Sequence, residues 1–197
     1  MAIQINGNGT ITGISVGGLP DGIVDTDMIA ANAVTSAKST ITGGKVLQVV
    51  QTTNTVRQAL ASSTYVATNK TVTITPTAAS SKILITFTGD VNTEANSRPA
   101  FITVYRSING GTFTNIAPVG SGQTVGGNDN HGFSGEVRGT SSRIQVNYAI
   151  NYLDSPSYSV GNTIEYKLYI RSDGNTIELQ SNSNAQPAIQ MAKEIAA

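Results

Sequence analysis

The segment Ile164-Glu-Tyr-Lys-Leu-Tyr-Ile-Arg171 alternates apolar and polar residues without interruption and is the clearest structural signal in the sequence. Successive side chains of a β-strand point to opposite faces, so this alternation predicts a strand with one face in a core and the other in water. The residues predicted for the core are Ile164, Tyr166, Leu168 and Ile170. A strand of this kind is typical of an antiparallel sheet that is covered on one side only.

The same period of two recurs through the sequence from Lys45 to the C-terminus. Apolar residues alternate with polar ones, or cluster in short runs, at residues 46–51, 72–75, 83–88, 101–106, 144–152, 177–180 and 188–195. Together these runs predict about eight to ten strands, with the spacing of a sandwich or barrel. No helix of useful length is expected after residue 45. The predicted fold class is therefore all-β, an antiparallel jelly-roll-like β-sandwich.

Turn residues separate the predicted strands. Asn109-Gly110-Gly111 and Asp173-Gly174-Asn175 each lie between two strand patterns and predict short hairpins, because Asn, Asp and Gly accept a positive φ at low cost. Pro76 and Pro156 should end strands, because proline cannot donate to a ladder. Residues 120–132 are rich in glycine and predict one long loop.

The first 44 residues have a different pattern from the rest. Eight glycines interrupt them, and their apolar residues stand singly between polar ones, so this segment cannot bury them against itself. We therefore expect residues 1–44 to form an extended N-terminal anchoring arm and residues 45–197 to form the β-sandwich. The arm residues predicted to contact another protein are Ile11, Ile14, Leu19, Ile23, Met28 and Ile29.

Composition limits the classes of partner. The 197 residues include 12 Lys and Arg, 12 Asp and Glu, and no Cys, so the chain is formally neutral and has no disulfides. A neutral chain lacks the basic surface expected of a nucleic-acid-binding protein. No run approaches the ~20 apolar residues of a membrane span, and no signal peptide is evident, so synthesis in the cytoplasm is expected. Only 12% of the residues are charged, so few charges protect the surface from association. We therefore expect the chain to bury part of its surface by forming an oligomer.

No catalytic or metal-binding constellation can be named. His131 is the only histidine, and Ser121 does not lie in a Gly-x-Ser-x-Gly turn, so no nucleophilic triad is predicted. Asp25 with Asp27, and Asp129 with its neighbouring asparagines, lack the remaining ligands of a calcium loop. The other acids are scattered and are interpreted as surface residues: Glu94, Glu136, Glu165, Glu178 and Glu194. The prediction is a non-enzymatic protein without cofactor or metal.

Seven tyrosines leave a carbohydrate-binding surface open as an alternative. Tyr148, Tyr152 and Tyr166 fall on predicted core faces, which favours packing roles for those three. The absence of tryptophan removes the best residue for stacking on sugars.

Several segments of the sequence resemble those of a known group of proteins. The segment from Gly9 to Lys38, with Val16-Gly-Gly-Leu-Pro-Asp-Gly-Ile-Val24 at its centre, resembles the N-terminal arm of small virion proteins of tailed bacteriophages, especially those infecting cyanobacteria and other aquatic bacteria. The sandwich attached to such arms is similar to this chain in five stretches: Gly44–Gln51, Val72–Pro76, Ser80–Ile85, Leu153–Pro156 and Glu194–Ala197.

The resemblance implies a virion structural protein that forms a homotrimer. Its expected role is capsid decoration, as a cement protein on the outer surface of the capsid that binds the major capsid protein or another virion protein. A short tail fibre or receptor-binding tail protein is the alternative, and it predicts a glycan receptor site in loops such as 120–132. Capsid decoration is favoured because the chain has no long repetitive shaft.

Overall fold

A computed structural model describes residues 4–5, 11–12, 44–93, 99–118, 132–133, 137–138, 144–180 and 186–197 of the chain. The chain divides into two compact units, Met1–Thr42 and Gly43–Ala197. In the first unit, β1 (Gln4–Ile5) pairs antiparallel with β2 (Ile11–Thr12). The second unit contains all other described strands and is called the two-sheet domain below.

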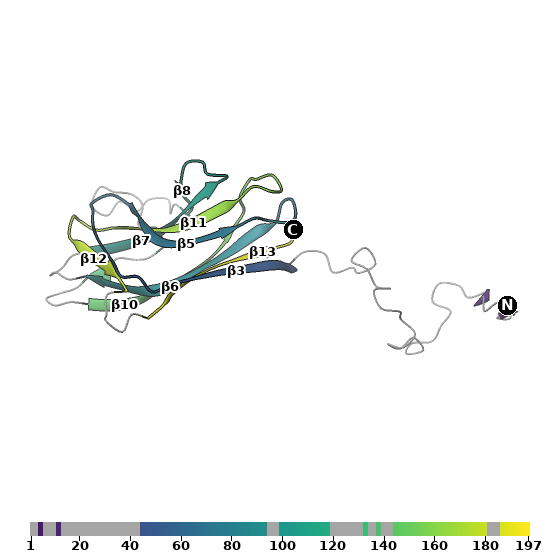
Figure 1. Cartoon of the computed structure of the whole chain (residues 1–197), viewed down its shortest axis with the longest axis horizontal. Coiled ribbons are helices and arrows are strands. Elements are labelled where there is room, and N and C mark those ends of the chain that lie inside the picture. The colour runs from purple at the N-terminus through teal and green to yellow at the C-terminus, as the bar shows by residue number, and fades with distance from the viewer. Residues whose placement is uncertain are drawn as a thin grey trace. The chain divides into compact units, whose positions relative to one another are not determined.

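The two-sheet domain consists of two antiparallel sheets that lie face to face (Figure 1). The larger sheet has the order β3-β13-β6-β12-β4, and β10 lies along the other edge of β6. Its strands are β3 (Val46–Asn54), β4 (Gln58–Ala61), β6 (Lys82–Thr93), β10 (Ile144–Asp154), β12 (Thr176–Leu179) and β13 (Ala188–Ile195). The smaller sheet has the order β5-β11-β7-β8, with β9 on β7. Its strands are β5 (Val66–Ile74), β7 (Pro99–Ile108), β8 (Thr114–Asn115), β9 (Val137–Arg138) and β11 (Ile164–Arg171). The all-β prediction is confirmed, since none of the described residues is helical.

The core lies between the two sheets and is built from one face of each long strand. Ile83, Ile85 and Phe87 of β6 are fully buried opposite the even-numbered residues of β11. The predicted core residues of β11, Ile164, Tyr166, Leu168 and Ile170, are at most 1% exposed. Burying a large apolar side chain contributes about 1.5–3 kcal/mol, so this shared core is the main source of stability.

Most strand boundaries follow the sequence pattern closely. The runs predicted at 164–171 and 188–195 coincide with β11 and β13. Asn109 and Gly110 adopt positive φ angles, and β7 pairs with β8 across them, so this hairpin prediction is confirmed. The strands before Pro76 and Pro156 end two residues earlier, at Ile74 and Asp154.

The hairpin predicted at Asp173-Gly174-Asn175 is wrong. Gly174 has a φ of 100°, as such a turn requires, but β11 pairs with β5 and β7 whereas β12 pairs with β4 and β6. The turn therefore carries the chain from one sheet to the other. Local turn chemistry specifies the change of direction but not which strand receives the next ladder.

A close contact inside the larger sheet depends on a glycine. Tyr148 of β10 lies opposite Gly89 of β6, and a Cβ atom on Gly89 would come within 2.6 Å of the tyrosine Oη. The missing side chain leaves room for the ring to lie across the strand. Burial raises the pKa of Tyr148, so its hydroxyl stays protonated. Within the described residues, no helix is long and apolar enough to cross a membrane.

Candidate functional site

One end of the two-sheet domain contains two buried carboxylates, Glu194 and Asp154, together with their hydrogen-bond donors. At this end β3 and β6 begin, and β5, β10 and β13 finish. The amide of Gly44 donates to the carbonyl of Ala196 at 3.1 Å, which places the junction with residues 1–43 beside the C-terminus. This end, called the junction end below, is where the N-terminal unit joins the domain.

Glu194 of β13 is the centre of a hydrogen-bonded cradle at the junction end. Its carboxylate is completely buried and accepts the backbone amides of Thr77 and Ala78, each at 3.0 Å. It also accepts the hydroxyl of Ser81 at 2.9 Å and the side-chain amide of Gln48 at 2.7 Å. The cradle therefore ties the turn between β5 and β6 to both the first and the last strand of the domain.

The cradle keeps Glu194 ionised. Burial alone would raise the pKa of its carboxyl group, but the hydrogen bonds from Thr77, Gln48, Ala78 and Ser81 outweigh burial and lower the pKa to about 2. A carboxylate that accepts several donors at once is stabilised in its charged form. The charge at this position is therefore structural and persists at all pH values near neutrality.

A second carboxylate joins the two sheets close to the cradle. Asp154 lies at the end of β10. Arg106 Nη1 donates to both of its carboxylate oxygens, at 2.8 Å to Oδ1 and 2.7 Å to Oδ2. The buried hydroxyl of Tyr166 donates to the same carboxylate at 2.7 Å. Burial and the neighbouring Asp154 both raise the pKa of Tyr166, which keeps this donor protonated. Arg106 and Tyr166 belong to the smaller sheet, so Asp154 fixes the spacing between the sheets.

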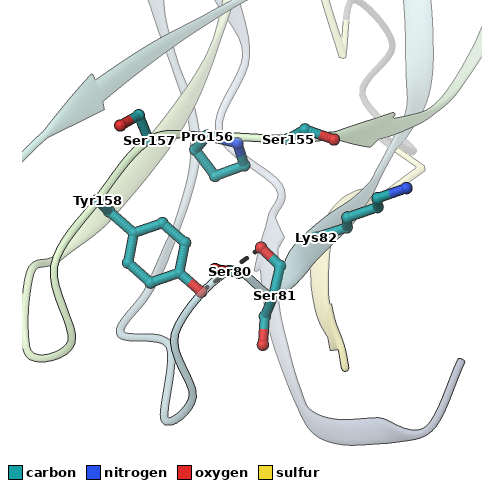
Figure 2. A pocket seen from close by; sticks show the side chains of 7 residues that line it. All are labelled: Ser80, Ser81, Lys82, Ser155, Pro156, Ser157 and Tyr158. Atoms are coloured by element: carbon teal, nitrogen blue, oxygen red, sulfur yellow. Dashed lines mark hydrogen bonds between the residues drawn. The ribbon is translucent and has the colours of Figure 1, made fainter. Parts of the chain in front are cut away.

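A pocket of about 310 Å³ opens at the junction end (Figure 2), and its lining includes Ser81, which donates to Glu194, and Ser155, which follows Asp154 in the sequence. The residues that line it come from the turn before β6, the first residue of β6 and the segment after β10: Ser80, Ser81, Lys82, Ser155, Pro156, Ser157 and Tyr158. Tyr158 donates its hydroxyl to the carbonyl of Ala78 at 2.7 Å and so holds the same turn as Glu194. Ser80 has a φ of 61°, a conformation that non-glycine residues rarely adopt. One wall of the pocket is thus a sharply bent turn that is hydrogen-bonded to both Tyr158 and Glu194.

A buried lysine closes one side of the domain. The side chain of Lys70 in β5 is fully buried, and its ammonium donates to Asn54 Oδ1 at 2.9 Å, to Val56 O at 2.7 Å and to Asn69 Oδ1 at 2.7 Å. Burial lowers the pKa of Lys70 to about 8, and the charge of Asp90 opposes this. Three acceptors match the three donors of an ammonium, so Lys70 binds the end of β3 to β5.

Aromatic rings gather on the outer face of the smaller sheet. Tyr105 and Tyr169 stack with centroids 3.9 Å apart, and Tyr65 and Phe113 extend the row at centroid distances of 6.2 and 6.0 Å. Lys167 lies over the Phe113 ring at 4.7 Å. These rings, called the aromatic row below, are half-buried and lie on the opposite face of the sheet from the core. The tyrosines predicted for the core are Tyr148, Tyr152 and Tyr166, and all three pack there.

The predicted arm contacts lie almost entirely outside the described residues. Ile11 lies in β2, opposite Ile5 of β1. Ile14, Leu19, Ile23, Met28 and Ile29 fall outside the described ranges, as do Ser121, Asp129 and His131. Among the described residues, no three side chains of the metal-binding types His, Asp and Glu come together.

Two acids that were interpreted as surface residues are buried, and that interpretation is wrong for them. Glu178 is 1% exposed, forms an ion pair with Arg57, and accepts the amide of Asn92 at 3.4 Å. Glu194 is buried in the cradle. Glu165 of β11 agrees with the prediction, since it is half-buried on the outer face beside Lys167. One signal for Glu194 was available, because it shares its strand face with Ala188 and Ala192, on the core side.

Comparison with known proteins finds no family model that matches the chain and no curated protein that is significantly similar to it. The arguments for function therefore rest on the residues themselves and on the geometry of the junction end.

Proposed function

We propose that this chain is a structural protein of a bacteriophage virion, a trimeric capsid decoration or cement protein that binds and stabilises the capsid shell. In this proposal the two-sheet domain is a jelly-roll-like sandwich, and residues 1–44 are an extended arm that anchors it. The partners are two further copies of the chain and the major capsid protein or another virion protein. The place of action is the outer surface of the capsid.

The observation that carries the proposal is the meeting of the stretches that resemble phage virion proteins. Gln48, Ser81 and Glu194 belong to three of those stretches, and Gln48 and Ser81 both donate to Glu194 in the cradle. The segment Val72–Pro76 meets the same group, because Gln48 donates to the carbonyl of Thr75 at 2.7 Å. Asp154 of Leu153–Pro156 lies opposite Ile83 at the same end. These stretches therefore form one connected structure next to the junction with the arm.

This arrangement suits an anchored protein for a physical reason. A force or a contact applied through the arm enters the domain at Gly44 and Lys45, which bond to Ala196. Glu194 lies two residues away and ties both terminal strands to the β5–β6 turn. Hydrogen bonds thus tie the junction to the first and last strands and to the β5–β6 turn, which suits a clamp on a shell.

A second candidate function is receptor binding by a short tail protein. The aromatic row favours this alternative, because half-buried aromatic rings on an outer face beside cations provide contacts for sugars. In that case the purified protein should bind host cells, and Tyr169→Ala should weaken the binding. A cement protein should show no such binding.

The decisive experiment is the number of copies of this chain per purified virion, measured by quantitative mass spectrometry against the major capsid protein. A simple ratio to the capsid protein, with hundreds of copies, is the result expected for decoration. A few to some tens of copies per virion would instead indicate that the protein is part of the tail. Absence from the virion would refute both functions.

A further inference from the structure

The edges of the two sheets are protected to very different degrees. On one side of the domain β3 and β5 face each other, and side chains satisfy the main chain between them. Asn54 donates to the carbonyl of Asn69 at 3.0 Å, and Gln58 accepts the amide of the same residue at 2.8 Å. Lys70 adds its bond to Val56. The ladders of β3 with β13 and of β5 with β11 also contain a register shift. These features protect an edge from pairing with another chain.

β10 is the long edge strand without such protection. It pairs with β6 through eleven consecutive positions, with no register shift, and it has no second neighbour among the described strands. The other edge strands are shorter, with nine residues each in β3 and β5, four in β4, and two each in β8 and β9. A long and regular open edge is a template for a further strand.

The sequence of β10 also lacks the residues that usually guard an edge. Its eleven residues, Ile-Gln-Val-Asn-Tyr-Ala-Ile-Asn-Tyr-Leu-Asp, include no Lys, Arg, Glu or Pro. The only charged residue is Asp154, which is held inside by Arg106 and Tyr166. No electrostatic repulsion therefore opposes the approach of a second uncharged strand.

We propose that β10 pairs antiparallel with β10 of a second copy of this chain, across a two-fold axis at Ala149. Around that residue the sequence Asn147-Tyr148-Ala149-Ile150-Asn151 reads nearly the same in both directions. In the antiparallel register, Asn147 of one copy lies opposite Asn151 of the other, and Tyr148 lies opposite Ile150.

None of these cross-strand pairs places a charge at the axis. Asn147 and Asn151 are exposed, and carboxamides both donate and accept hydrogen bonds. Tyr148 and Ile150 are buried in the core of their own chain, so this pair brings neither a charge nor a protruding side chain to the approaching strand. At the axis, Ala149 meets its own copy, and its small side chain is exposed and leaves the strands free to approach.

The pairing is isologous, so it joins two copies and cannot by itself generate a three-fold trimer. In a shell of trimers it would connect neighbouring trimers, whereas in solution it gives dimers or pairs of trimers. The inference does not depend on the proposed role in the capsid, since it follows from β10 alone.

The test uses single cysteines in the full-length chain, which contains none of its own. In Ala149→Cys, the two cysteines lie opposite each other across the axis. Directly opposed residues have Cα atoms about 4.5–5.5 Å apart, within the range that a disulfide spans. We expect a disulfide-linked dimer to be the main species on a non-reducing gel after mild oxidation at micromolar concentration.

The matched control is Gln145→Cys, on the same strand and the same exposed face. This position lies four residues from the axis, so its two copies are separated by eight residues, or roughly 27 Å, and should stay monomeric on the gel. A folded Ala149→Cys protein that gives no dimer would overturn the pairing. Equal cross-linking of both variants would overturn it too, because random collision then explains the bond.

A second pair of variants keeps the test decisive if Ala149→Cys does not fold. Mixing Asn147→Cys with Asn151→Cys should give a disulfide between the two different chains, because these residues are opposed in the proposed register. Each variant alone should cross-link much less. If the mixture gives no more dimer than the separate proteins, the register at Ala149 is wrong.

Discussion

Replacing Glu194 by glutamine tests whether the cradle holds the junction end together. The substitution keeps the size of the side chain but removes its charge and replaces one acceptor oxygen with an NH2 group. The donors around it are the amides of Thr77 and Ala78 and the side chains of Ser81 and Gln48. At least one of these donors then faces another donor inside a buried site, which leaves it without a partner.

The size of the effect follows from the pKa of Glu194. Lowering the pKa from 4.5 to about 2 corresponds to a preference of the folded state for the carboxylate of about 3 kcal/mol. The glutamine side chain keeps one acceptor oxygen, so part of this interaction survives the substitution. We therefore expect Glu194→Gln to reduce the free energy of unfolding by about 2 kcal/mol at pH 7.

The pH dependence supplies the sign of the effect. Because the folded-state pKa is depressed, the contribution of Glu194 is fully present above pH 4.5 and is lost as the pH falls towards 2. The difference between the wild-type protein and Glu194→Gln should therefore shrink steadily over this interval. A loss of stability caused only by altered packing would stay constant with pH.

The assay is urea unfolding followed by circular dichroism, at one protein concentration because association adds to apparent stability. Glu165→Gln is the matched control, since Glu165 is half-buried and bonds to Lys167 and Thr71 on the outer face. Its loss should stay near 0.5 kcal/mol or less, as is usual for accessible ion pairs. A loss below about 0.5 kcal/mol for Glu194→Gln at pH 7, or one that does not change with pH, would refute the reasoning.

Four further outcomes are expected. Leu168→Asp places an unpaired charge in the core and should cost more than about 3 kcal/mol, so soluble, folded protein from that variant would show that the β11 register is wrong. Deleting residues 1–40 should leave a folded domain that no longer joins the particle, as checked by incorporation into virions. Because the pKa of Lys70 is lowered to about 8, the free energy of unfolding should rise between pH 8 and 10.5, and Lys70→Met should abolish that rise. Tyr166→Phe removes one donor from Asp154 and should cost about 1.5–3 kcal/mol in urea unfolding.

The core was predictable because the alternation of β11 records which face each residue occupies. Ile164, Leu168 and Ile170 are buried where the period of two places them. Lys70 shows the limit of this rule, because it occupies a core position between Thr68 and Val72 on the same face of β5. Its burial depends on acceptors from Asn54, the last residue of β3, and from Val56, which lies between β3 and β4. A pattern within one strand carries no information about such partners.

The cradle was not predictable for the same physical reason. Glu194 and Thr77 are 117 residues apart in the sequence. The residues that neighbour Glu194 in the sequence therefore do not predict which backbone amides donate to it. Glu178 is similar, because its burial follows from the crossing of the chain at Gly174 into the larger sheet. Strand faces are local properties of the sequence, whereas the pairing of buried charges is a property of topology.

The distribution of charge links the interior of the domain to its proposed assembly. Among the described residues, the buried charged side chains are Lys70, Asp90, Asp154, Arg171, Glu178 and Glu194. The chain has only 12 acidic and 12 basic residues. Because these buried residues are part of that number, fewer charged residues remain for the surface. The exposed residues of β10 carry no charge, and contacts between uncharged residues are not screened by salt. Association through β10 should therefore persist at high ionic strength, whereas an interface built from surface ion pairs would dissociate.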